Sequence, residues 1–114
     1  METKYPSPDG RYIFQIEAWE ARMSLWVESP KLIDTQSGQA IYSFKDANWS
    51  LDSADWLDAN TVKIFLRKYP GDHQPSGVEA ILNCQQKQAS LMGGPAMSLS
   101  ALEAALDALL VHGP

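Results

Sequence analysis

Residues 61–69, TVKIFLRKY, alternate in character along the chain. One set of side chains is aliphatic and the other mixes charged and aromatic groups: Val62, Ile64 and Leu66 against Lys63, Phe65 and Arg67. Successive side chains of a β-strand point to opposite faces, so this pattern predicts a strand with one buried face. Turn residues lie on both sides of it, at 58–60 and in the Pro/Gly-rich run 70–77.

Similar alternation extends through the first ninety residues of the chain. It recurs at 12–21, 24–28, 40–45 and 78–84, and a hairpin turn with Gly38 is predicted at 34–39. We therefore predict a mainly β fold of the α+β type: a single antiparallel meander of about five or six strands with one C-terminal amphipathic helix.

The C-terminal part changes pattern. Residues 85–97 are rich in Gln and contain Gly93-Gly94-Pro95, which predicts a linker at the end of a sheet domain spanning 1–97. Residues 98–114 carry leucines at helical spacing, and Ser100 with Glu103 has the spacing of a capping box. The predicted helix must cover apolar surface, either on its own sheet or on a partner protomer.

Two stretches have the order of elements found in propeller blades. Residues 7–14, SPDGRYIF, place a tight turn before a strand, and residues 25–44, LWVESPKLIDTQSGQAIYSF, add a strand, an Asp, a short turn with Gly and a returning strand. Residues 57–62 also align with residues 8–13, at an offset of 49. Within 7–66 the chain thus resembles TolB-like and WD-repeat β-propeller blades, whose repeats are about 40–50 residues long.

That resemblance implies blade-like strands but no closed propeller. A propeller needs at least about four blades, and the chain has room for about two. We expect one curled sheet in which the C-terminal helix takes the place of the missing neighbouring blades. A ring of several chains is the alternative.

Length and charge narrow the class of protein. The chain has 114 residues, 45% of them apolar and 20% charged, as in one globular domain. Its formal net charge of −5 argues against nucleic acid and anionic membrane surfaces as partners.

We find no signal-like N-terminal segment and no apolar run approaching about 18 residues, and so expect a cytoplasmic protein of bacterial type. Cys84 is the single cysteine and is expected to be buried and inert.

No motif predicts a metal, a cofactor or a catalytic centre. The two histidines, His73 and His112, have no further ligands at metal-binding spacing, and no glycine-rich phosphate loop occurs. Asp72, His73 and Ser76 define the one enzymatic alternative, a small hydrolase. Catalytic triads draw their members from distant segments, so we favour a polar turn and a protein that is not an enzyme.

The aromatic residues are the most informative candidates for function. Alternation places Trp19, Trp26, Phe65 and Tyr69 among charged residues, on the face opposite the aliphatic one. Large aromatics and Arg are enriched at the centres of protein–protein contacts. We therefore predict five partner-binding residues: Trp19, Trp26, Phe65, Arg67 and Tyr69.

A purely structural explanation of these aromatics is also open. The helix could cover the mixed face, or the sheet could curl so that both faces turn partly inward. Trp49 and Trp56 would then cap an open end of the core.

These observations favour a non-enzymatic protein-binding module whose partner is another protein, and the acidity suits a basic one. By class alone, the chain resembles small bacterial immunity proteins, which implies neutralisation of a toxin by steric occlusion. The alternative is a structural or accessory protein that forms a homodimer or larger homo-oligomer through the mixed face or the helix.

Overall fold

The computed structural model describes residues 2–22, 25–69, 73–74, 77–91, 93–109 and 111–112. A first sheet has four strands in the order β1-β2-β3-β4: β1 Glu2–Lys4, β2 Tyr12–Arg22, β3 Leu25–Asp34 and β4 Gln39–Ser43. A second has five in the order β10-β9-β8-β6-β5: β5 Trp49–Trp56, β6 Thr61–Lys68, β8 Val78–Asn83, β9 Gln88–Leu91 and β10 Met97–Ser98. The remaining elements are short: β7 His73–Gln74 paired with β11 Val111–His112, the 3₁₀ turn η1 Leu99–Ala101 and the helix α1 Leu102–Leu109.

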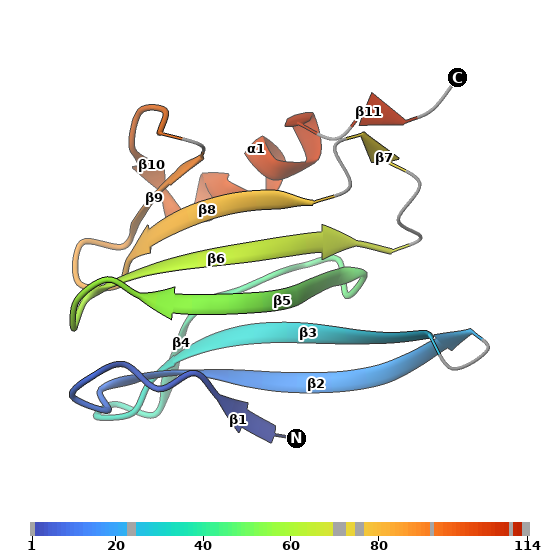
Figure 1. The fold of residues 1–114 in the computed structure, drawn as a ribbon. Helices are drawn as coiled ribbons and strands as arrows, with labels where there is room; N and C mark the ends of the chain where they lie inside the picture. The colour runs from blue at the N-terminus through green and yellow to red at the C-terminus, as the bar shows by residue number, and fades with distance from the viewer. Residues whose placement is uncertain are drawn as a thin grey trace.

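The predicted class is confirmed: the fold is mainly β, with antiparallel pairing and a C-terminal helix. The strands form two sheets, however, where the sequence predicted one. β3 and β5 lie side by side between them (Figure 1), joined by a hydrogen bond of 3.0 Å from the Glu28 N–H to Ser50 Oγ instead of a ladder. The hydrogen bond of Trp56 Nε1 to the Tyr5 carbonyl, 2.7 Å, then ties the far end of β5 to the loop before β2.

One hydrophobic core joins both sheets and the helix. The aliphatic faces predicted for β6 and β8 are buried in it, with Val62, Leu66 and Ala80 at 0% exposure. Trp49 is also fully buried, and Trp56 packs against the core and stacks on Tyr12. These two indoles therefore belong to the folded interior of the chain.

The hairpin of β2 and β3 extends beyond its neighbours. β1 pairs with residues 14–16 of β2 and β4 with residues 31–34 of β3, so residues 17–22 and 25–30 form a two-stranded distal ribbon. Two-stranded ribbons twist more strongly than wide sheets. Along the β2–β3 hairpin the buried face changes: Phe14 and Leu32 face the core before the ribbon begins, whereas Val27 on the opposite face is buried within it.

The C-terminal segment is more regular than the sequence suggested. The region predicted as a linker contains β9, and the helix covers fewer residues than 98–114, with Leu102 and Leu106 buried in the chain's own core. No helix within the described residues is long and apolar enough to span a membrane.

The predicted capping box does not form. η1 precedes α1, so Ser100 lies inside a 3₁₀ turn, and the N-cap of that turn, Ser98, makes no side-chain capping bond. Glu103 instead accepts hydrogen bonds from the backbone N–H groups of Lys45 and Asp46, at 2.8 and 3.0 Å. The helix is thereby held to the segment that connects the two sheets.

Candidate protein-binding surface

Three large apolar side chains of the described chain are substantially exposed: Trp26 at 57%, Leu57 at 56% and Phe65 at 38%. Trp26 and Phe65 are among the residues predicted to bind a partner, and both lie within strands. Leu57 follows the last residue of β5. Exposed aromatic groups on paired strands are candidate anchors because little conformational entropy is lost when they are covered.

Phe65 lies on the solvent face of β5, β6 and β8. It is opposite Ser53 on one side and Glu79 on the other. A hollow of about 170 Å³ beside it, the Phe65 hollow, is lined by residues of three strands: Ser53, Asp55, Lys63, Ile64, Phe65 and Glu79. The edge of the Phe65 ring rests on Gly77, where a Cβ atom would come within 2.5 Å of it. Gly77 thus permits the ring to lie close to the chain entering β8.

The charges on this face are largely paired. Arg67 forms an ion pair with Asp52, and Lys63 lies 3.9 Å from Glu79. Arg67 is also opposite Ser50, which links β5 to Glu28 of β3. The predicted residue Arg67 is therefore exposed, next to Phe65 on the same face, and already held by a carboxylate.

Trp26 lies on the distal ribbon, away from Trp19. The ladder places Trp26 opposite Glu20 and Trp19 opposite Val27, and adjacent pairs of a ladder point to opposite faces. The two tryptophans therefore do not share a face, although simple alternation grouped them. Trp26 is two residues from Glu28, the point at which β3 meets β5.

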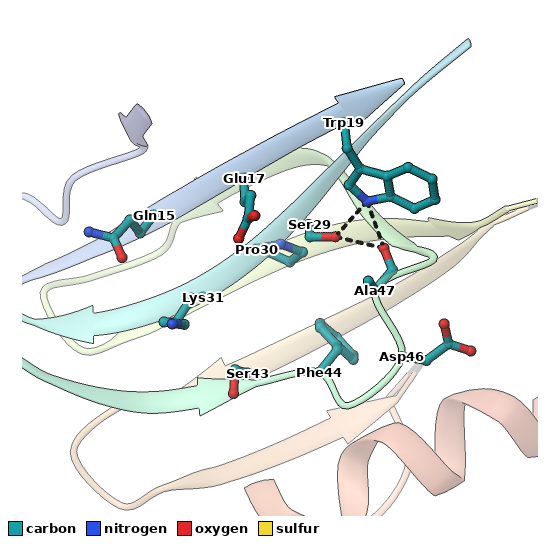
Figure 2. Close-up of a pocket in the computed structure, with 10 residues that line it drawn as sticks. All are labelled: Gln15, Glu17, Trp19, Ser29, Pro30, Lys31, Ser43, Phe44, Asp46 and Ala47. Carbon is teal, nitrogen blue, oxygen red and sulfur yellow. Dashed lines mark hydrogen bonds between the residues drawn. The ribbon is translucent and has the colours of Figure 1, made fainter. Parts of the chain in front are cut away.

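Trp19 and Tyr69 form a corner of the fold. Their rings meet edge to face with centroids 6.5 Å apart, and both side chains are half-buried. Trp19 Nε1 donates to Ser29 Oγ and to the Ala47 carbonyl, at 3.3 and 3.2 Å, as Figure 2 shows. These contacts hold the segment between β4 and β5 against the distal ribbon.

Beside this corner lies a groove of about 190 Å³, the Trp19 groove (Figure 2). Its lining combines rings with charged and polar groups: Gln15, Glu17, Trp19, Ser29, Pro30, Lys31, Ser43, Phe44, Asp46 and Ala47. Asp46 is already engaged, because the Asn48 N–H and Lys68 hold its pKa below the usual range. Glu17 and Lys31 have no hydrogen bond or ion pair to any described residue, so the groove presents one free charge of each sign.

Two members of the Phe65 hollow were missed from the sequence. Asp55 and Glu79 are not among the five residues that the sequence predicted to bind a partner. The strand pairing brings them together, because Asp55 lies opposite Lys63 and Glu79 opposite Phe65. The signal that would have found them is the register of β5 and β8 on β6, which a single sequence does not contain.

The enzymatic alternative cannot be placed in the fold. Asp72 and Ser76 lie outside the described residues, and only the backbone of His73 is described, in β7. Cys84 is buried, and burial raises the pKa of its thiol to about 12, which keeps it protonated at neutral pH. Within the described ranges, no three His, Cys, Asp or Glu side chains are grouped so that they could hold a metal ion.

Comparison of the chain with protein-family models, curated proteins and solved structures finds no match.

Proposed function

We propose that this protein is a non-enzymatic protein-binding module. The observation that carries the proposal is the exposure of Trp26 on β3 and of Phe65 on β6, in two sheets that meet where β3 lies beside β5. Trp is enriched among the residues that dominate binding energies, and Phe among those that fill interface cores. Arg67, fixed by Asp52 beside Phe65, supplies a polar rim to the same contact.

Trp19 and Tyr69 have a different part in this proposal. Their mutual contact and the hydrogen bonds of the Trp19 indole support the ribbon that carries Trp26. We expect these two residues to act on binding through the shape of the ribbon. As a concrete case we propose a bacterial immunity protein that occludes a toxin in the cytoplasm, and a toxin gene directly upstream would support it.

The function is tested with the double variant Trp26→Ala/Phe65→Ala. Partners captured from the source cells by the wild-type chain are identified, purified and titrated calorimetrically against both proteins. We expect affinity to fall at least about 100-fold, since each anchor is worth about 1–2 kcal/mol or more. Folding should be retained, because both side chains are exposed.

Leu57→Ala is the matched control. Leu57 is as exposed as Trp26 but lies at the opposite end of β5 from Ser50, so its truncation should leave affinity unchanged. A purified partner that binds the double variant as tightly as the wild type would remove the proposed surface.

A second candidate, self-association, is favoured by one observation. Beyond residue 16, β2 has no described strand on its β1 side, and an open edge can pair with another chain. Glu17 and Glu20 lie on that edge and would bring like charges together in a symmetric pair. Light scattering over a range of concentrations distinguishes the two: a dimer at micromolar concentration supports self-association, and a strict monomer removes it.

A further inference from the structure

We infer that the Phe65 hollow receives an arginine side chain from the partner, so the partner presents a basic segment to this face. This inference rests on the proposed function and names the chemistry of the partner. Of the carboxylates whose side chains are described, two have no hydrogen bond or ion pair to another described residue, Glu17 and Asp55, and each lines one of the hollows described above.

The charge of the Phe65 hollow favours a cation. Asp55, Glu79 and Lys63 line it, giving two carboxylates and one ammonium group. The cations of the face are engaged, Arg67 by Asp52 and Lys63 by Glu79, which leaves Asp55 without an ion pair although Lys63 lies opposite it on the ladder. The separation of Lys63 and Glu79 is long, 3.9 Å, and both side chains are about half exposed, so Glu79 is free to turn toward an incoming cation.

The shape of the hollow favours arginine over lysine. An exposed ring flanks the carboxylates, and a planar guanidinium stacks on an aromatic face while pairing with a carboxylate through two N–H groups. A lysine ammonium would satisfy the charge without the stacking. Because Phe65 rests on Gly77, its ring is held in place before the cation arrives.

The Trp19 groove is the competing position, and its charges disfavour a cation. Glu17 there is also unpaired, but the Lys31 ammonium lines the same groove and is unpaired as well. An incoming arginine would therefore meet one attractive and one repulsive charge. Glu17 thus provides a matched control for Asp55: each is an exposed strand carboxylate with no described partner.

The experiment is an NMR titration of the full ¹⁵N-labelled chain with an acetylated, amidated tetra-arginine peptide. We expect saturable shifts of the amide signals of Ser53, Asp55 and Phe65. Asp55→Asn should weaken binding about five-fold, because a pair of opposite charges is replaced by a hydrogen bond from the guanidinium to a neutral acceptor, and Glu17→Gln should leave it unchanged. Phe65→Leu should weaken arginine binding while leaving any tetra-lysine binding unchanged.

Three results would overturn the inference that the Phe65 hollow receives an arginine. Equal weakening by Asp55→Asn and Glu17→Gln would mean that the peptide binds the acidic surface without a specific site. Amide shifts confined to residues 15–19 and 31 would place the cation in the Trp19 groove. Equal affinity for tetra-lysine and tetra-arginine would remove the role of Phe65. The proposed function fails separately. A partner whose affinity depends on Trp26 and Phe65 but not on Asp55 removes the arginine alone, whereas peptide binding at Asp55 with no such partner removes the protein-binding role alone.

Discussion

Glu103 holds the helix to the rest of the molecule through backbone groups. Its two carboxylate oxygens accept the consecutive N–H groups of Lys45 and Asp46, which lie where the chain leaves β4 for β5. Backbone donors in such a connection have no strand partner, and an ionised acceptor binds them more strongly than a neutral one. One side chain thus links α1 to the path between the two sheets.

Removal of this carboxylate should destabilise the fold. Glu103→Ala leaves two backbone donors without their acceptor, and we expect the free energy of unfolding to fall by about 1–3 kcal/mol. Ser100→Ala should cost less than about 0.5 kcal/mol, because Ser100 is exposed and its hydroxyl bonds to the exposed Ser98 hydroxyl. Urea denaturation at pH 7 measures both. A capping box would instead make Ser100→Ala cost as much as Glu103→Ala.

At the scale of the element, the distal ribbon shows that burial depends on which strands lie alongside. Over residues 14–16, before the ribbon begins, β2 has β1 on one side and β3 on the other, and Phe14 and Ile16 face the core. Farther out it has only β3, and there Val27, on the opposite face, is the buried residue. The strong twist of a two-stranded ribbon accounts for this change of face.

The ribbon leads to a prediction that contradicts simple alternation. Val27→Ala should reduce the free energy of unfolding by about 1–2 kcal/mol, because two buried methyl groups are lost. Trp26→Ala, its neighbour, removes a much larger side chain but should change stability by less than about 0.5 kcal/mol. Thermal and urea unfolding of the two variants measure both changes in the free energy of unfolding. A larger loss for Trp26→Ala would mean that the ribbon packs on its other face.

The same contrast explains what the sequence predicted well. β6 and β8 each have a strand on both sides over most of their length, and their alternation of Val62, Ile64, Val78 and Leu82 predicted the buried face correctly. The lengths of β1 and β4, the register that joins Asp55 to Lys63, and the reach of Glu103 to Lys45 are set by residues distant in sequence. The local sequence pattern therefore predicted the fold class and the exposure of Phe65. It did not predict that the five binding residues lie in three different parts of the fold: the distal ribbon, the Trp19–Tyr69 corner and the solvent face of β6.

At the scale of the whole molecule, the core extends across both sheets and encloses ionisable groups. Cys84 is 2% exposed, and its N–H donates to the Asn60 carbonyl at 2.7 Å. Burial, reinforced by the negative charges of Asp34 and Asp58, raises the pKa of its thiol from 9.0 to about 12. Burial also raises the pKa values of the Tyr12 and Tyr42 hydroxyls.

Stability should therefore decline on the alkaline side. Each of these acids has a higher pKa in the folded chain than in the unfolded chain, so its contribution is complete below the unfolded value. For Cys84 the contribution is lost as the pH rises from about 9 to about 12, because the unfolded chain loses a proton that the folded chain retains. Cys84→Ala should remove part of this decline and leave the part due to the tyrosines, as measured by urea unfolding between pH 7 and pH 11.

The same burial makes the thiol a reporter of opening of the core. At pH 8 the folded chain should react with a thiol reagent at least about 100-fold more slowly than the chain in denaturing urea, since the reactive thiolate forms only when the core opens. If the unfolding that loosens α1 also exposes Cys84, Glu103→Ala should increase the labelling rate by the factor that corresponds to its loss of unfolding free energy. Labelling of the native protein as fast as the unfolded chain would contradict the burial of this thiol, which is 2% exposed in the turn after β8.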